Sequence, residues 1–266
     1  MKETEKTQPS SKEARRKIAI TGKGGSGKTV LTALMVRLLR TDTSLRVLAI
    51  DADPTLSLPY MLGITLRRTV GDLRQSMIED PEARAEIKSK HIRDVMVGAL
   101  EKGDGFDILA MGRPEGPGCY CSVNDLLRYG IDSLSNQYDV TLIDCEAGPE
   151  QVNRRVVQRL DVLIIVTDPT MRGIRAARVI DQVARKYEST RTGLVINKVQ
   201  GDIEPLVETA RAWNLDVLGC IPLDQNITVC DLVGDSVLHS PPDSPSIVAV
   251  QEVLKRLALW SDLPTT

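Results

Sequence analysis

A glycine-rich segment near the amino terminus has the residue types and the spacing of a phosphate-binding loop. Residues 22–29 are Gly-Lys-Gly-Gly-Ser-Gly-Lys-Thr, placed between an apolar stretch at 17–21 and a helical pattern at 28–40. Glycines let the backbone turn its N–H groups toward a phosphate, and the following helix N-terminus adds positive partial charge. Lys28 would reach the β- and γ-phosphates, and the Thr29 hydroxyl would bind Mg²⁺. The expected nucleotide contacts of this loop are Gly22, Lys23, Gly24, Gly25, Ser26, Gly27, Lys28, Thr29 and Val30.

Three carboxylates follow two other apolar stretches and would complete such a site. Asp51 and Asp53 come directly after the stretch at 46–50, and Asp144 follows the stretch at 140–143. The carboxyl ends of parallel strands border the crevice in which open α/β sheets bind ligands. Phosphoryl transfer to water needs one group to hold hydrated Mg²⁺ and another to orient the water. A single aspartate at a strand end often only caps a helix, but here the carboxylates accompany a phosphate loop and predict hydrolysis.

Two cysteines, Cys119 and Cys121, are separated by one residue. In an extended segment, residues i and i+2 point to the same side, so both thiolates would face one metal ion. Thiolates suit Zn²⁺ and other soft or borderline metals, but two ligands do not close a tetrahedral site. A twofold-symmetric dimer would supply four thiolates on its axis. The spacing by itself also fits a pair of loop cysteines with redox activity.

Short apolar stretches alternate with helical patterns along the chain, which predicts βαβ units and a mostly parallel sheet flanked by helices. We expect a single α/β P-loop domain over residues 17–262, preceded by a disordered polar leader at 1–16. The strands are expected at 17–21, 46–50, 106–111, 140–143, 162–166, 193–196 and 216–221, and the helices at 28–40, 171–188, 202–213 and 246–260. The charged residues 66–101 predict a helical excursion before the third strand.

The composition excludes several classes of protein. Lys plus Arg is 34 and Asp plus Glu is 36, which gives a formal charge of −2 and argues against a strongly electrostatic nucleic-acid binder. One Phe, two Trp and five Tyr are too few for base-stacking platforms. The chain lacks an apolar run of membrane-spanning length and a secretory signal. Five cysteines without disulfide-rich spacing predict a reducing, cytoplasmic compartment.

Lys23 gives the loop a second lysine, in the pattern K-G-G-x-G-K-T. This pattern resembles the deviant P-loop of the family that includes MinD, ParA, the nitrogenase iron protein and the arsenite and tail-anchor ATPases. The resemblance implies a homodimeric Mg²⁺-dependent ATPase that hydrolyses ATP to ADP and phosphate. It also implies that Lys23 reaches across the dimer to the nucleotide of the partner.

The same resemblance implies roles for further residues. Asp53 would align the attacking water in switch I, Asp144 would lie near Mg²⁺ in switch II, and Asp51 would be a supporting Mg²⁺ ligand. Lys23, Lys28, Asp53 and Asp144 thus form the expected catalytic set. The pair Asn197 and Lys198 would read the adenine edge, and Pro222, Leu223 and Asp224 would form the opposite wall of the base site.

The surroundings of the cysteine pair resemble the CooC-type nickel-insertion ATPases, which mature carbon monoxide dehydrogenase and, in related forms, acetyl-CoA synthase. The resemblance rests on three motifs: G-P-G-C-Y-C-x-x-N-x-x-L-R at 116–128, D-x-E-A-G-x-E at 144–150 and D-P-T-x-R-G-I-R at 168–175. The resemblance implies that Cys119 and Cys121 bind Ni²⁺ or Zn²⁺ and that a nickel enzyme is the client. Ser122 and Cys145 depart from the family pattern, where proline and asparagine are usual.

Two other functions fit the same ATPase machinery. An iron–sulfur reductase resembling the nitrogenase iron protein would need a second cysteine in a C-G-G context beyond switch II, which the chain lacks. A positioning ATPase resembling MinD or ParA would bind a membrane or DNA. An amphipathic membrane helix would follow the last core helix, where residues 261–266 are too short for one. We therefore expect neither nucleic acid nor a membrane as a partner.

Overall fold

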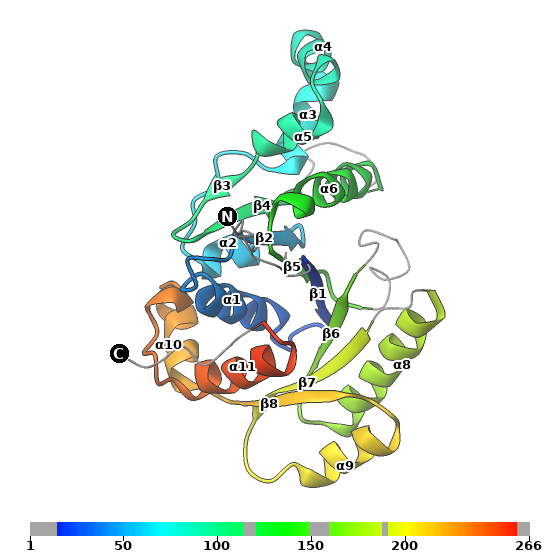
Figure 1. The fold of residues 1–266 in the computed structure, drawn as a ribbon, viewed down its shortest axis with the longest axis vertical. Helices are drawn as coiled ribbons and strands as arrows, with labels where there is room; N and C mark the ends of the chain where they lie inside the picture. Colours follow the sequence, from blue (N-terminus) through cyan, green and yellow to red (C-terminus); the bar gives the residue numbers. More distant parts are fainter. Residues whose placement is uncertain (1–14, 114–120, 149–159, 188–190, 260–266) are drawn as a thin grey trace, which may run out of the picture.

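The computed structural model describes residues 15–113, 121–148, 160–187 and 191–259. Figure 1 shows their arrangement as a twisted sheet with helices on both faces. The strands are β1 Arg16–Gly22, β2 Val47–Ala52, β3 Glu101–Lys102, β4 Phe106–Ala110, β5 Val140–Cys145, β6 Val162–Thr167, β7 Arg191–Val199 and β8 Val217–Pro222. The α-helices are α1 Lys28–Leu39, α2 Ser57–Met61, α3 Val70–Glu79, α4 Pro81–Ser89, α5 Ile92–Val97, α6 Cys121–Leu134, α8 Met171–Tyr187, α9 Glu204–Ala212, α10 Gln225–Val233 and α11 Pro245–Arg256.

The eight strands form one sheet in the order β3-β4-β2-β5-β1-β6-β7-β8. All neighbouring strands are parallel except β3, which pairs antiparallel with β4 at the edge. Every residue of β2, β5 and β6 is buried, because helices cover both faces of a parallel sheet. The predicted single α/β domain with a mostly parallel sheet is confirmed. Its central strand, β1, leads directly into the glycine-rich loop.

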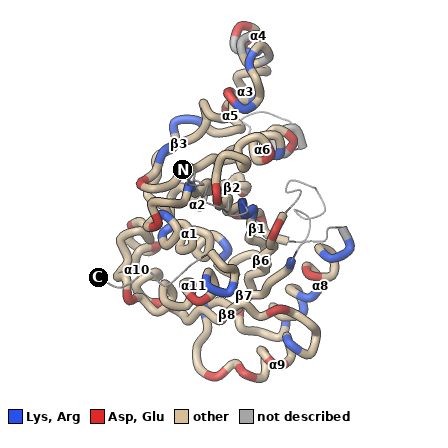
Figure 2. The backbone as a smooth tube through the Cα atoms, in the orientation of Figure 1, with Lys and Arg blue, Asp and Glu red and all other residues tan. Residues whose placement is uncertain are grey.

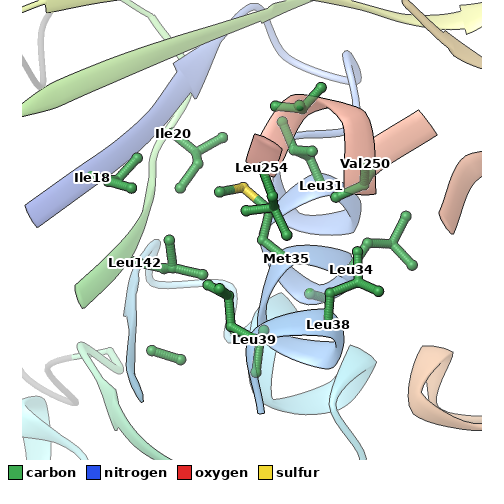
Figure 3. Packing of buried hydrophobic residues seen from close by; sticks show 14 of the residues in the cluster. Ile18, Ile20, Leu31, Leu34, Met35, Leu38, Leu39, Leu142, Val250 and Leu254 are labelled. Atoms are coloured by element: carbon green, nitrogen blue, oxygen red, sulfur yellow. The ribbon is translucent and has the colours of Figure 1, made fainter. Parts of the chain in front are cut away.

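Alternate residues of the central strands serve two separate hydrophobic layers. Ile18 and Ile20 of β1 belong to the cluster on the side of α1 and α11, whereas Ala19 belongs to the cluster on the side of α6 and α8. Figure 3 shows Met35 and four leucines of α1 packed between β1 and α11. This packing fixes the start of α1 at the carboxyl end of β1, where the loop joins them.

Several elements were not expected from the sequence, among them the helices α2, α6 and α10 and the strand β3. The edge strand β3 was not expected, because two residues give no apolar period. Helix α10 was also not expected, because its apolar residues lie all round the helix and include the exposed Val229, Leu232 and Val233. The residues that cap α10 could have predicted it from the sequence. The Asp224 side chain accepts a hydrogen bond from Asn226 N at 2.9 Å, and Gly234 ends the helix with φ +74°.

The predicted helical excursion at 66–101 contains α3, α4 and α5, which project from one end of the molecule (Figure 1). A capping box between Thr69 and Asp72 starts α3. Lysines and arginines are interspersed with acidic residues along most elements (Figure 2), in keeping with the formal charge of −2. Among the described residues, no helix has the length and apolar character needed to cross a bilayer.

Candidate functional site: a phosphate loop with two buried carboxylates

The glycine-rich loop presents the open N-terminus of α1 to the carboxyl edge of the sheet. Gly27, the residue before α1, has φ +93°, and no side chain caps the first turn. The first backbone N–H groups of a helix lack partners within the helix, so this end is prepared for an anion. Lys28, only 9% exposed, begins the helix at the same point. The predicted phosphate-binding geometry is therefore present in the fold.

Contacts from the end of β7 fix the outer part of the loop. The Asn197 Nδ2 donates a hydrogen bond to the Ser26 carbonyl at 2.9 Å, and the Lys198 Nζ donates to the Gly25 carbonyl at 2.9 Å. A Cβ at position 27 would lie 2.2 Å from the Asn197 Nδ2, so glycine is required there by both space and backbone angle. Asn197 thus supports the loop through one end of its amide, a contact that its expected role in reading adenine did not include.

Asp51 and Asp144 are register partners on the neighbouring strands β2 and β5. Asp51 is 0% exposed, and its carboxylate accepts the backbone N–H groups of Asp53 at 3.0 Å and Leu58 at 3.1 Å. Asp144 is 1% exposed and accepts a hydrogen bond from the Thr29 hydroxyl at 2.6 Å. The sheet therefore brings together a threonine and two aspartates that the sequence analysis assigned to Mg²⁺.

The burial of these carboxylates changes their protonation. Desolvation, reinforced by the charge of Asp144, raises the pKa of Asp51 to about 8. Desolvation also raises the pKa of Asp144 to about 7, although the Thr29 hydrogen bond and the Lys28 charge oppose it. Two neighbouring buried carboxylates favour a cation, and their oxygen ligands suit Mg²⁺, which keeps several of its own waters. No three His, Cys, Asp or Glu side chains in the described part of the chain form a ready-made metal cage.

The segments that follow these two strands carry Asp53 and Gly148. The Asp53 carboxylate, partly buried, accepts hydrogen bonds from Thr55 N at 2.9 Å and the Thr55 hydroxyl at 2.8 Å. The Gly148 N–H donates to the Gly22 carbonyl at 3.1 Å, which joins the segment after β5 to the start of the loop. Lys23 is exposed and, within the described residues, its amine has no hydrogen-bond partner. Asp53 lies close to the two buried carboxylates, since its charge helps to raise the pKa of both, and Lys23 is exposed on the loop.

A cleft of about 510 Å³ opens beside the N-terminus of α1. Gly25, Gly27 and the residues 28–30 form its floor, and the segment at 55–61 forms one wall. Lys198 and Asp231 line it from the ends of β7 and α10. The sequence analysis did not identify the 55–61 wall or Asp231, because neither belongs to a short motif. The cleft is continuous with the glycine-rich loop, because Gly25, Gly27 and Lys28 line it.

The residues 222–224, which were expected to form a wall of the base site, differ in their exposure to solvent. Leu223 is 47% exposed. Asp224 is buried, and besides capping α10 its Oδ2 accepts hydrogen bonds from Ser246 N at 3.0 Å and the Ser246 hydroxyl at 2.7 Å. These contacts use the Asp224 carboxylate to join α10 to α11. The expected base contact at Asp224 is thus a buried structural contact between two helices, whereas the Leu223 side chain is open to solvent.

The cysteine pair lies at the margin of the described structure. Cys119 falls outside the described residues, and Cys121 is the first residue of α6. The segment that leads to them starts beside the site, because Met111 N donates to the Asp51 carbonyl at 2.8 Å. The Met111 carbonyl in turn accepts the Gly71 N–H of α3 at 2.8 Å. Cys145, which departs from the family pattern, is buried, and burial strongly raises the pKa of its thiol.

The paired carboxylates predict that the metal-free protein loses stability as the pH rises. Unfolded aspartates titrate near pH 4, while Asp144 and Asp51 titrate near 7 and 8 in the fold. The folded state therefore binds more protons in between, and the free energy of unfolding falls from about pH 4 to about pH 8. Replacing Asp144 by asparagine should reduce that fall by a few kcal/mol, as measured by urea unfolding with a chelator at several pH values.

The matched control for that measurement is Asp243→Asn, which changes an exposed carboxylate in the loop before α11. It should leave the pH dependence as in the wild type. An Asp144→Asn variant that loses as much stability between pH 5 and pH 8 as the wild type would contradict the assignment of a buried, proton-binding carboxylate.

Comparison with known proteins agrees with this geometry. Residues 17–237 match the model of the CobQ/CobB/MinD/ParA nucleotide-binding domain. The chain is 37% identical to an uncharacterized ATP-binding protein of Methanocaldococcus jannaschii, over 90% of this chain and 97% of that protein. It is 30% identical to the carbon monoxide dehydrogenase accessory protein CooC of Rhodospirillum rubrum, over 85% of this chain and 90% of that protein.

A solved structure shares the fold. The septum site-determining protein MinD of Pyrococcus horikoshii, complexed with Mg-ADP, superposes with a TM-score of 0.69 at 24% identity, covering 91% of this chain and 96% of that one. The family match covers the glycine-rich loop, Asp51, Asp144 and every strand of the sheet except the first residue of β1. With a P-loop ATPase fold and this match over most of its length, the chain belongs to the CobQ/CobB/MinD/ParA nucleotide-binding family.

Proposed function

We propose that the protein is a homodimeric, ATP-dependent metallochaperone that binds Ni²⁺, or Zn²⁺ in its place, through Cys119 and Cys121. Its client would be a nickel enzyme of the carbon monoxide dehydrogenase or acetyl-CoA synthase type. The similarity to the accessory protein CooC supports this choice within the family. The CooC-like motifs around the two cysteines support it as well.

The observation that carries the proposal is the hydrogen bond between Met111 N and the Asp51 carbonyl at 2.8 Å. It joins the backbone of Asp51, one of the two buried aspartates, to the chain segment that continues into the cysteines. We infer that a shift of the Asp51 backbone during ATP binding would move that segment as well. Met111 also contacts α3, because its carbonyl accepts a hydrogen bond from Gly71 N. Helix α6, which starts at Cys121, packs against α3 and α5.

Each residue of the site has a defined task in this function. The loop N–H groups and Lys28 would hold the phosphates, and Thr29 with Asp144 and Asp51 would hold Mg²⁺, which supplies charge neutralisation at the phosphates. Asp53 would orient the attacking water from its partly buried place after β2. Lys23, exposed on the loop, would contact the nucleotide of the partner subunit. ATP binding would thereby close the dimer and bring two cysteine pairs together.

Sedimentation in Mg·ATP with added Ni²⁺ tests this function. The wild type should sediment as a dimer that carries one nickel ion per two chains. Lys23→Ala should still bind ATP through the rest of the loop, but it should remain largely monomeric and carry little nickel, because the contact across the interface is missing. Lys102→Ala removes an exposed lysine of the edge strand β3 and serves as the matched control. A dimer of unchanged strength in Lys23→Ala would refute the proposed interface.

The second candidate is a positioning ATPase of the MinD type. The chain is 25% identical to the septum site-determining protein MinD of Bacillus subtilis, over 90% of its own length and 87% of that protein. This function uses the same site but needs a membrane or DNA surface instead of a metal. Pelleting with anionic liposomes or DNA in the presence of ATP separates the two candidates, since a metallochaperone should stay in the supernatant.

A further inference from the structure

A second cavity, with a volume of about 370 Å³, lies at the edge of the sheet opposite the glycine-rich loop. It is lined by three consecutive basic residues at 15–17, where the chain enters β1, by the end of α6 and by residues at the starts of β5 and β6. Strand β1 separates the cavity from the loop by about 20 Å, since each residue of a strand adds about 3.3 Å. The cavity therefore shares no residue with the nucleotide site.

Thr141, the second residue of β5, places a hydroxyl deep in this cavity. The residue lines the cavity although it is only 1% exposed. It lies on the same face of the sheet as Ile143, which packs in the cluster on the side of α6. Among the residues that the structure describes, none forms a hydrogen bond with the Thr141 hydroxyl. Because buried polar groups are normally paired, this hydroxyl is available to a ligand in the cavity.

The charged groups around this hydroxyl leave a cation exposed to the cavity. Lys17, the register partner of Thr141 on β1, engages both carboxylates of the lining. Its amine lies 3.3 Å from the Asp132 Oδ1, and its backbone N–H donates to the Asp161 Oδ2 at 2.7 Å. Arg15 is exposed and lines the same cavity, and in the described part of the chain no hydrogen bond or ion pair engages its guanidinium.

A third carboxylate near Arg15 is bound elsewhere. The Nε and Nη2 of Arg46 donate to the two oxygens of Asp139 at 3.2 Å each. These hydrogen bonds hold the pKa of Asp139 below its usual range, and the charge of Arg15 adds a smaller effect. The donors of the Arg15 guanidinium thus remain open to a ligand.

The available groups restrict what the cavity can bind. A guanidinium only donates hydrogen bonds, and its planar fork matches the oxygens of a carboxylate or a phosphate. The Thr141 hydroxyl can donate one more hydrogen bond to the same ligand. A volume of about 370 Å³ lies in the range of small-molecule sites. We propose that this cavity is a second binding site, specific for a small oxyanion, in which Arg15 and Thr141 contact the phosphate or carboxylate group of the ligand.

NMR of the full chain, following backbone amide shifts during titration with inorganic phosphate and separately with acetate, tests the site. The amides of Lys17, Thr141 and Asp161 should shift with saturation at about millimolar concentrations of at least one anion. The tighter of the two assigns the ligand group as phosphate or carboxylate. Arg15→Ala and Thr141→Val should each weaken this binding about tenfold, the usual effect of one lost hydrogen bond to a charged group. Thr141→Ser keeps the hydroxyl and should bind as the wild type does.

The matched control is Arg191→Ala, which removes an exposed arginine at the start of β7, on the same edge of the sheet but outside the cavity. It should leave the binding unchanged. Because phosphate also suits the glycine-rich loop, the titration is repeated with Lys28→Ala, in which the shifts at Lys17 and Thr141 should persist.

Two results would overturn this inference. Shifts confined to residues 22–29 would show that phosphate binds only in the glycine-rich loop. Shifts at the cavity that do not saturate, or that are the same in Arg15→Ala and Thr141→Val as in the wild type, would mean an adventitious ion only. The site uses none of the residues assigned to ATP, so a wild type that binds no ATP would overturn the proposed function and leave this inference standing.

Discussion

Replacing Lys28 by alanine should abolish measurable ATP binding, with a loss in affinity of more than about a hundredfold. The Lys28 side chain is 9% exposed and begins α1, where the open helix N-terminus already favours an anion. Its ammonium group would make charge-assisted hydrogen bonds to two phosphates, and each such bond contributes about 1.5–3 kcal/mol. Because Lys28 is the first residue of α1, alanine at this position leaves the start of the helix without its ammonium group.

A second effect of the same substitution acts on the carboxylates. The charge of Lys28 lowers the pKa of Asp144. Without it, a larger fraction of Asp144 would be protonated at neutral pH, and the site would hold Mg²⁺ less well. Isothermal calorimetry of ATP binding in Mg²⁺ checks both effects, and Lys102→Ala again serves as the control of equal charge. Binding by Lys28→Ala within a few-fold of the wild type would show that the loop is not the phosphate site.

The second large effect is expected at the cysteine pair. Cys119→Ser and Cys121→Ser should each weaken Ni²⁺ or Zn²⁺ binding by at least about a hundredfold, because two thiolates per dimer cannot complete a tetrahedral shell. Binding should also weaken as the pH falls, since thiolate ligands must lose their protons. Titration of each metal into anaerobic, reduced protein with Mg·ATP measures both effects.

The remaining cysteines provide the controls for that titration. Cys145 and Cys230 are buried, and Cys220 is exposed on β8, so Cys220→Ser tests the removal of an accessible thiol away from the proposed site. Substituting any of these three by serine should change metal affinity little. A stoichiometry of one metal ion per chain, or full affinity in Cys119→Ser, would mean that the shared four-thiolate site is wrong.

The phosphate loop could be predicted from the sequence because its physics is local. Eight consecutive residues contain the glycines, the lysine and the hydroxyl that the turn and the helix N-terminus require. The buried strands were likewise readable as short continuous apolar runs, and the described strand bounds differ from the expected ones by a few residues. Helix α10 was missed because its apolar residues do not gather on one face, and its signal lay in the caps Asp224 and Gly234.

The sequence by itself determined which chemical groups the site contains, while the tertiary structure decided which of them meet. Strand order is set by packing between distant segments, so the pairing of Asp51 with Asp144 on β2 and β5 is absent from any local pattern. The support of the loop by Asn197, 171 residues from Ser26, arises in the same way, because β7 reaches the loop only when the sheet is assembled. The elevated pKa values of the two carboxylates also belong to the fold, since they result from burial, which no residue has in an extended chain.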